Sequence, residues 1–517
     1  MKRLNRWIVS LCLLFAGASA LLSCRDDLST LDVNKIAGVA FDTTGMSSLS
    51  SFQFEHLVVN PKLKAEGLQE ANLKYEWKLK SFDGIGETLV LGTEKNLDYE
   101  VRLKPNPAGK FYQIVYTVTD TKTGLDYIMA WRLVVKNNIG EGLVIAENDG
   151  GQSSDLSHIM SPLVTRGFTG ESVKHHVYSA INGSVFPGLI TQMRFTTVYG
   201  VDMLYAITAS DIYQVATLDY TFAAKNEDLF YGHTGDFKPQ LLAGVYQSDI
   251  FAGNGKLYST YLGAARKYGL PFDTRFTVPA HIGFNAEEYG ANISVNFYDE
   301  VNGQFVYQPS VSSFGDRNQY AVPYASGMPF DPVHLTGKTN LAAGNGANHE
   351  FLHVLKDKTS GDISLYVFTP GGYDDVEWVA TPPVPLAVYN ISAAPDIQNA
   401  KFFVFAKDQK VMYYATSSKI YAMLYSTATP VFQEKYSAPA GEQITTLQLY
   451  EQAQFLYNSY TQPDIATNQK QLIMSTYGTE GKVYILPMVN PGTGNIDQAH
   501  IKTFGGFGHI TAITAQK

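Results

Sequence analysis

The chain has 517 residues, of which 45% are hydrophobic, 13% aromatic and only 17% charged. This composition is globular and excludes a disordered, fibrous or polytopic membrane protein. The net charge of −9 at pH 7 argues against a nucleic-acid partner, which requires a basic surface. The 33 tyrosines and 29 phenylalanines, with few charged residues, favour an all-β protein over a helical one.

The N-terminus has the pattern of an export signal. Lys2, Arg3 and Arg6 precede an apolar run at residues 7–22, which has 16 residues. A membrane-spanning helix needs about 18 or more apolar residues, so the run predicts a secretory signal peptide. It ends in Leu-Leu-Ser-Cys at residues 21–24, which resembles a bacterial lipobox. We therefore expect residues 1–23 to be removed and Cys24 to be lipidated; the alternative is an ordinary cleavage near residue 18 or 20.

The cysteine content agrees with a lipid anchor. The chain has two cysteines, Cys12 and Cys24, and Cys12 lies within the predicted signal peptide. A single remaining cysteine excludes an internal disulfide. Several acyl chains on Cys24 would give a stable anchor without a transmembrane helix.

Residues 24–35 are predicted to be a short lipidated tether. Arg25, Asp26 and Asp27 follow the cysteine directly. Acidic residues in this position resemble the surface-export signal of lipoproteins in bacteria that have Sus-type nutrient importers. This resemblance implies an outer-membrane protein that faces the cell exterior; the alternative is an ordinary solvated charge cluster on the tether.

Residues 36–138 have the pattern of a β-sandwich. Leu73, Tyr75, Trp77 and Leu79 alternate with polar residues, as expected for a half-buried strand, and Trp77 is the expected core tryptophan. Gly, Pro and Asp turns separate the apolar runs. The predicted strands are 36–41, 56–59, 73–80, 97–103, 111–118 and 127–135.

Two segments of this region carry a family resemblance. The sequences YEWKL at residues 75–79 and YQIVYTVTD at residues 112–120 resemble the facing strands of PKD domains, a branch of the immunoglobulin-like fold. With the lipobox, the chain resembles the PKD-like lipoproteins that are encoded beside SusC/SusD-type importers. The motifs are structural, so the resemblance implies architecture and context more than chemistry.

Residues 139–517 predict a degenerate β-propeller. A turn signal at residues 137–140 is followed by apolar hairpins whose second strands start about 54 residues apart, near the repeat length of propeller blades. Seven blades are favoured, and the alternatives are six or eight blades or two further sandwiches. Residues 510–513 are expected to close the ring against residues 143–146. The predicted hairpin pairs are 204–207 with 212–215, 243–246 with 256–259, 293–297 with 304–307, 351–355 with 363–368, 402–405 with 411–414, and 472–476 with 483–486.

The segment His349-Glu350-Phe351-Leu352-His353 matches the H-E-x-x-H pattern of zinc proteases. That chemistry needs a helix, because only a helix brings residues four apart onto one zinc ion. Glycines precede this segment, and a glycine-containing turn follows it within a few residues, so we expect a strand paired with residues 363–368. On a strand the two histidines are about 13 Å apart and cannot share a metal.

Binding candidates come from one polar and aromatic loop. Tyr373, Asp374, Asp375 and Trp378 could form a ligand platform, since a flat aromatic ring stacks on a sugar or peptide. The alternative is ordinary packing. The adjacent His175 and His176 are expected to be surface residues. We expect no catalytic residue, no metal and no cofactor.

The predicted anchor and shape indicate a non-enzymatic surface lipoprotein, and the family resemblance implies that it is an accessory subunit of a SusC/SusD-type TonB-dependent importer. It would capture an oligosaccharide or an oligopeptide, contact the transporter, or do both. Two alternatives stay open at this point: a propeller hydrolase acting on glycans or peptides, and a structural subunit without a ligand of its own.

Overall fold

The computed structural model describes residues 38–42, 48–81, 88–106, 109–196, 202–232, 235–245, 248–260, 267–285, 292–311, 317–374, 376–377, 379–453 and 464–517. The predicted signal peptide and tether, with Cys24 and residues 25–27, lie outside these ranges. The regular secondary structure of the described residues is almost entirely β-strand, so the all-β prediction is confirmed. The chain divides into two compact units. The described part of the first covers residues 38–49, 57–99 and 112–133, and the second covers residues 50–56, 100–111 and 134–517.

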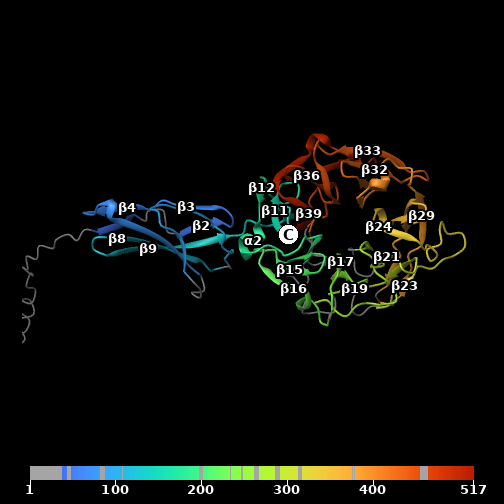
Figure 1. The fold of residues 1–517 in the computed structure, drawn as a ribbon, viewed down its shortest axis with the longest axis horizontal. Helices are drawn as coiled ribbons and strands as arrows, with labels where there is room; N and C mark the ends of the chain where they lie inside the picture. The colour runs from blue at the N-terminus through green and yellow to red at the C-terminus, as the bar shows by residue number, and fades with distance from the viewer. Residues whose placement is uncertain are drawn as a thin grey trace, which may run out of the picture. The chain divides into compact units, whose positions relative to one another are not determined.

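The N-terminal region contains a five-stranded antiparallel sheet and two strand pairs (Figure 1). The sheet has the order β2-β9-β8-β5-β6, and the pairs are β1-β4 and β3-β7. Predicted strands 56–59 and 73–80 match β3 and β5, whereas β2, β4 and β6 were not predicted. The bounds are β1 Gly38–Asp42, β2 Ser48–Phe52, β3 His56–Val59, β4 Lys62–Glu66, β5 Leu73–Lys80, β6 Leu89–Gly92, β7 Leu97–Glu100, β8 Tyr112–Asp120 and β9 Asp126–Lys136.

Three stacked aromatic rings form the centre of this region. Trp77 of β5 is fully buried, and its ring lies 4.1 Å from that of Tyr116 on β8. The ring centroid of Trp131 on β9 lies 5.9 Å from that of Trp77. The Trp77 Nε1–H donates to the carbonyl of Glu94 at 2.8 Å, which satisfies its polar atom. The predicted core tryptophan is therefore confirmed.

The second unit is a β-propeller in which antiparallel sheets follow one another around a ring (Figure 1). Their strand orders are β12-β11-β10-β39, β13-β14-β15-β16, β17-β18-β19, β20-β21-β22-β23, β24-β25-β26-β29, β30-β31-β32-β33 and β34-β35-β36-β37, with β38 also paired to β36. The propeller prediction is confirmed. The number of blades stays a prediction, because segments between and within these sheets, such as 261–266 and 454–463, lie outside the described residues.

The bounds of the propeller elements follow the chain order. They are β10 Gly142–Asn148, β11 Asp155–Met160, β12 Ser172–Lys174, α2 Val177–Asn182, β13 Gln192–Thr196, β14 Met203–Ile207, β15 Ile212–Ala216, β16 Phe222–Lys225, β17 Pro239–Val245, β18 Ser248–Gly253, β19 Lys256–Ser259, β20 Gly283–Phe284, β21 Val295–Asp299, β22 Gln304–Gln308, β23 Tyr320–Ala321, β24 Lys338–Asn345, β25 Phe351–Asp357, β26 Ile363–Phe368, β27 Gly372–Asp374, β28 Val379–Thr381, β29 Pro385–Asn390, β30 Phe402–Phe405, β31 Val411–Ala415, β32 Lys419–Leu424, β33 Val431–Ser437, β34 Gln443–Leu449, β35 Gln471–Tyr477, β36 Gly481–Val489, β37 Asn495–Ile496, β38 Lys502–Phe507 and β39 His509–Gln516.

The ring is closed by its two ends. β39, the last strand of the chain, pairs antiparallel with β10, and Ile513 lies opposite Ile145. The inner strands of successive sheets then contact one another in the order β39, β13, β17, β20, β24, β30, β34 and back to β39. The predicted ring closure by residues 510–513 against the strand that contains residues 143–146 is therefore confirmed, with residues 510–513 lying opposite residues 145–147.

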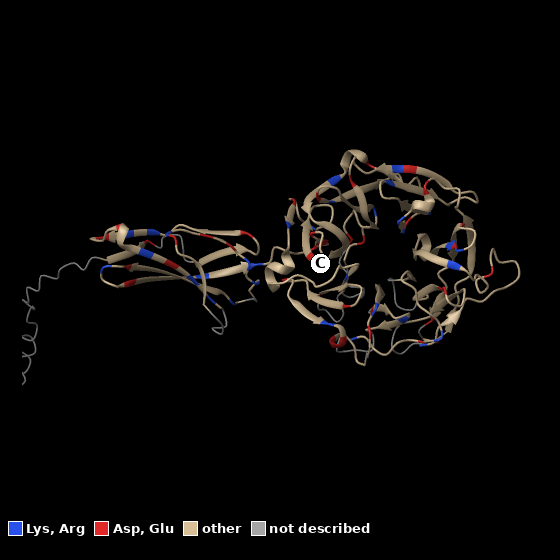
Figure 2. Ribbon diagram, viewed as in Figure 1, with Lys and Arg blue, Asp and Glu red and all other residues tan. Residues whose placement is uncertain are grey.

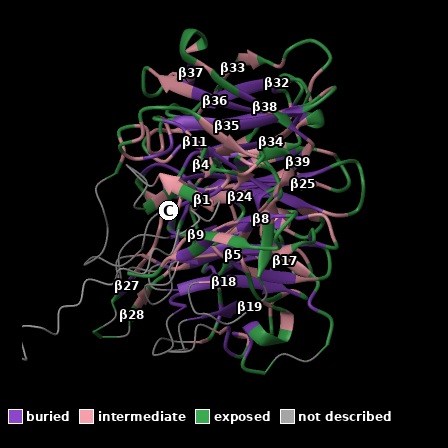
Figure 3. Cartoon of the chain, turned by 90° about the vertical axis from the view of Figure 1, so that its left-hand side faces the viewer, coloured by how far each residue is buried: buried purple, intermediate pink, exposed green. Residues whose placement is uncertain are grey.

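Central strands of the sheets are buried on both faces, because each sheet packs between two neighbours. β18, β25 and β35 are buried along most of their length (Figure 3). Such strands lack apolar and polar alternation. This explains one error in the predicted hairpins: residues 243–246 do not pair with 256–259. The unpredicted strand β18 lies between β17 and β19 and pairs with both.

Candidate functional site

The loop predicted as a ligand platform is a short hairpin, β27 paired with β28. Tyr373 is 6% exposed and packs in the apolar cluster that contains Ile293 and Phe368. The Asp374 carboxylate accepts the backbone N–H groups of Val376 and Glu377, both at 2.9 Å, and these bonds lower its pKa. Asp375 and Trp378 lie outside the described residues. Of the four candidates, Tyr373 therefore belongs to the core and Asp374 stabilises the turn.

The H-E-x-x-H segment is divided between a turn and a strand. His349 ends a 3-10 turn at Ala347–His349, whereas His353 lies in β25, which pairs with β26 as predicted. Phe351 and Leu352 point into different apolar clusters, which confirms that neighbouring side chains on this strand face opposite ways. The expected strand therefore contains His353 but not His349, which lies in the preceding turn.

The functional groups of this segment have structural partners instead of a metal. His353 is fully buried, and its Nε2–H donates to Oδ1 of Asn296 at 2.6 Å. Burial lowers the pKa of His353 to about 3, so the imidazole is neutral. The Glu350 carboxylate accepts the Lys410 ammonium at 3.0 Å across to the next sheet. Within the described residues, no group of three or more His, Cys, Asp or Glu side chains could hold a metal ion.

The adjacent histidines lie between β12 and α2. The ring of His175 packs against Phe507 at 4.8 Å, and burial lowers its pKa. His176 is half exposed, and its Nε2 lies 3.9 Å from the buried Glu147 carboxylate. Glu147 also accepts the backbone N–H of Gly508 at 2.5 Å. These contacts join the first and last sheet strands, which is a structural role.

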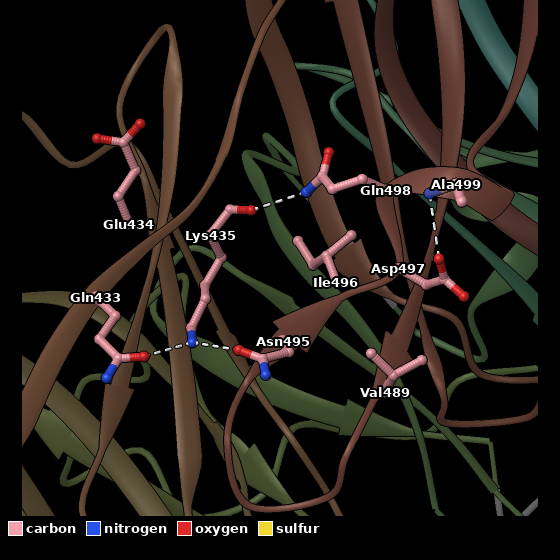
Figure 4. Close-up of a pocket in the computed structure, with 9 residues that line it drawn as sticks. All are labelled: Gln433, Glu434, Lys435, Val489, Asn495, Ile496, Asp497, Gln498 and Ala499. Carbon is pink, nitrogen blue, oxygen red and sulfur yellow. Dashed lines mark hydrogen bonds between the residues drawn. The ribbon is translucent and has the colours of Figure 1, made fainter.

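A polar hollow on the propeller is the candidate binding site. It has a volume of about 830 Å³ and lies where β33 meets β37 and the 3-10 turn Gln498–His500 that follows (Figure 4). Polar and charged side chains make up two thirds of its lining, and the remainder are small aliphatic groups. The lining residues are Gln433, Glu434, Lys435, Val489, Asn495, Ile496, Asp497, Gln498 and Ala499.

Lys435 has an unusual environment in this hollow. Its ammonium donates to Oε1 of Gln433 and to Oδ1 of Asn495, both at 2.6 Å (Figure 4). Both acceptors are neutral amides, and Lys435 forms no ion pair with any carboxylate in the described part of the chain. Burial lowers its pKa. The backbone carbonyl of Lys435 accepts Nε2 of Gln498 at 3.0 Å, which holds the two walls of the hollow together.

The two carboxylates of the lining have partners other than Lys435. Glu434 accepts the Lys419 ammonium at 2.7 Å, and this bond lowers the pKa of Glu434. Asp497 accepts Nδ1 of His500 at 2.7 Å, and this bond lowers the pKa of Asp497. Neither carboxylate of the lining is therefore bonded to Lys435.

Sequence reasoning missed this hollow. Its side chains come from β33 and, about 60 residues later, from β36, β37 and the turn that follows, which belong to the neighbouring sheet, and none of them forms a motif. A sequence signal was present only in β33, where Gln433, Glu434 and Lys435 form a polar run within a predicted β region. Such a run is ordinary for the outer strand of a sheet.

Comparison with known proteins supports the N-terminal assignment. A family model described as PKD-like family matches residues 25–189, which is less than half of the chain. No curated protein matches the sequence. Among the helices of the described residues, none has the length and hydrophobicity needed to cross a membrane.

Several solved structures resemble the chain at low identity. A "Quinonprotein alcohol dehydrogenase-like protein" from Bacteroides thetaiotaomicron is 11% identical, with 93% of this chain and 98% of that chain covered and a TM-score of 0.45. The Cps50 (Swd1) β-propeller domain of Myceliophteria thermophila is 12% identical over 60% of this chain and 86% of that chain, with a TM-score of 0.30. PorZ, a surface component of the type-IX secretion system of Porphyromonas gingivalis, is 10% identical over 71% of this chain and 45% of that chain, with a TM-score of 0.32.

Proposed function

We propose that this protein is a non-enzymatic lipoprotein of the outer-membrane surface, anchored through Cys24. It serves as an accessory subunit of a SusC/SusD-type importer and captures an oligosaccharide or an oligopeptide for it. The importer follows from the family resemblance, and the anchor follows from the lipobox. The PKD-like match over residues 25–189 is consistent with this family context.

The observation that carries the binding role is the hollow around Lys435. It offers charged and amide side chains that hydrogen bonds hold in position, without a nucleophile and base in contact with one another among its lining residues. Preorganised polar groups around an open hollow suit reversible binding, because a ligand does not have to order them. Glu350 and His353, the residues with the sharpest catalytic pattern, are occupied by Lys410 and Asn296.

Co-purification tests the proposal. The tagged full-length protein is isolated from gently solubilised outer membranes, and its partners are identified by mass spectrometry. We expect a SusC-like and a SusD-like protein in amounts comparable with the bait. Recovery of the lipoprotein alone, under conditions in which a known importer complex of the same cells stays intact, would contradict the proposal.

A further inference from the structure

The propeller as a whole is unfavourable for an anion. Residues 139–517 contain 22 Lys and Arg residues against 33 Asp and Glu, whereas residues 36–138 contain 12 of each kind. Figure 2 shows both kinds of charge interspersed along the strands of the sandwich. An anionic ligand of the propeller therefore needs a local group of donors that overcomes the general negative field.

The Lys435 hollow contains such a group. An ammonium can only donate, so the side-chain oxygens of Gln433 and Asn495 must face it. Their NH₂ groups then point away from Lys435, as Figure 4 shows, and remain able to donate. The ammonium uses two of its three N–H donors on the amides and keeps the third. Gln433 and Lys435 of β33 and Asn495 of β37 thus present neighbouring N–H donors.

The missing carboxylate partner of Lys435 favours an acceptor with a negative charge. Glu434 is bonded to Lys419 and Asp497 to His500, so neither carboxylate of the lining is bonded to the Lys435 ammonium. A partly desolvated ammonium without a carboxylate gains most from a charge-assisted hydrogen bond with an anion. A ligand carboxylate fits both the charge and the donor arrangement.

The rest of the lining favours a sugar over a peptide. The apolar part consists only of Val489, Ile496 and Ala499, which form no deep pocket for a large peptide side chain. Gln498 keeps its Oε1 as an acceptor, because its Nε2 is bound to the Lys435 carbonyl. Amide donors and acceptors around a shallow hollow match the hydroxyl groups of a saccharide.

We propose that the hollow binds the carboxylate of an acidic oligosaccharide, with Lys435 as the charge-recognising residue and Gln433 and Asn495 as donors beside it. This assignment rests on the proposed function and narrows its ligand class. The carboxylate lies against Lys435, and the neighbouring sugar hydroxyls bond to the amides and to Gln498.

Calorimetric titration of the full-length protein in detergent tests the assignment. The probes are trigalacturonate, the same trisaccharide with methyl-esterified carboxyl groups, and triglutamate. We expect saturable binding of trigalacturonate, with the ester and triglutamate each at least about tenfold weaker, because a charged hydrogen bond is worth about 1.5–3 kcal/mol. Equal binding of the ester, equal or tighter binding of triglutamate, or no binding of trigalacturonate would overturn the assignment.

Three variants locate the site. Lys435→Gln is expected to weaken trigalacturonate binding about tenfold or more. Gln433→Glu changes a single exposed side chain and places a carboxylate against the ammonium, so it should weaken binding in the same way without removing Lys435. Lys401→Gln is the matched control, since Lys401 is an exposed lysine outside the lining. Undiminished binding in both hollow variants, with binding intact in the control, would overturn the assignment.

This test fails separately from that of the proposed function. If the protein co-purifies with the importer but does not bind trigalacturonate, the proposed function stands and the ligand assignment is wrong. If the protein binds trigalacturonate through Lys435 but has no importer partner, the ligand assignment stands and the accessory role is wrong.

Discussion

Ile145 of β10 lies directly opposite Ile513 of β39, so the first and last strands of the propeller belong to one sheet. Both side chains are buried in the same apolar cluster. Two further contacts reinforce this closure: Gln516 accepts the Tyr220 hydroxyl at 3.0 Å and donates to the Gly140 carbonyl at 3.1 Å. The ring therefore depends on a strand at the extreme end of the chain.

The closure predicts a large effect of a charge at this position. Ile513→Asp is expected to lower the free energy of unfolding by about 3 kcal/mol or more, because it buries an unpaired carboxylate in the sheet that closes the ring. Urea unfolding followed by tryptophan fluorescence and circular dichroism measures the change. Thr503→Asp, at an exposed position of β38, is the control and should change the free energy by no more than about 0.5 kcal/mol. Similar midpoints for the two variants would argue against closure through β39.

The Glu350–Lys410 pair predicts an asymmetry between a buried and an exposed ion pair. Glu350 is 5% exposed, and one of its carboxylate oxygens has no hydrogen-bond partner. Lys410→Met leaves this carboxylate buried without its cation and should cost about 1–3 kcal/mol. Lys358→Met breaks the Lys358–Glu300 ion pair, which is more exposed than the Lys410–Glu350 pair. It should lower the free energy of unfolding by less than about 1 kcal/mol. Thermal or urea unfolding of the two variants measures both losses of stability. An equal loss of stability in the two variants would contradict the structural role of Glu350.

Two buried histidines predict a loss of stability in acid. Burial lowers the pKa of His158 and of His353 from 6.5 to about 3, so the unfolded chain binds more protons than the folded protein between these values. Stability is therefore complete above pH 6.5 and falls as the pH decreases, by about 1.4 kcal/mol per pH unit for each histidine. Burial raises the pKa of Asp249 from 3.8 to about 6, which acts in the opposite direction over that narrower range.

Urea unfolding between pH 7.5 and pH 4 measures this dependence. His353→Gln should make the free energy of unfolding less dependent on pH by about 1.4 kcal/mol per pH unit below pH 6. His334→Gln is the control, because the side chain of His334 is 81% exposed. An unchanged pH dependence in His353→Gln would show that His353 is protonated in the folded protein.

How far the sequence predicts this protein depends on which residues carry the signal. The alternation around Trp77 identified β5, and the five-residue apolar run after Glu350 identified β25, because local periodicity reports local structure. β18 was missed because Asp249 and Gly253 interrupt a strand that is buried on both faces. Tyr373 looked like a surface aromatic, and its packing against residues about 80 positions earlier in the chain has no local signal.

The candidate site was beyond sequence reasoning for the same reason. Lys435 becomes distinctive only when Asn495, from the neighbouring sheet, supplies an amide instead of a carboxylate. In the sequence, Lys435 is an ordinary lysine in a polar run. The packing of two sheets brings Gln433, Lys435 and Asn495 together, and no residue spacing in the sequence predicts this contact.

The lipobox predicts a simple change in location. Cys24→Ala should prevent lipidation and release the protein from membranes, because the acyl chains that form the predicted anchor would be lost. Membrane fractions washed with high salt are probed for the protein before and after the substitution. Retention of Cys24→Ala in the washed membranes would contradict the anchor.

Exposure to the cell exterior is the most direct test of a surface-binding lipoprotein. Protease is added to intact cells that make the full-length protein, and the propeller is followed with an antibody while a periplasmic protein reports on leakage. The account predicts that the propeller is digested in intact cells while the periplasmic protein survives. Protection of the propeller until the cells are lysed would place it on the periplasmic side and contradict the account.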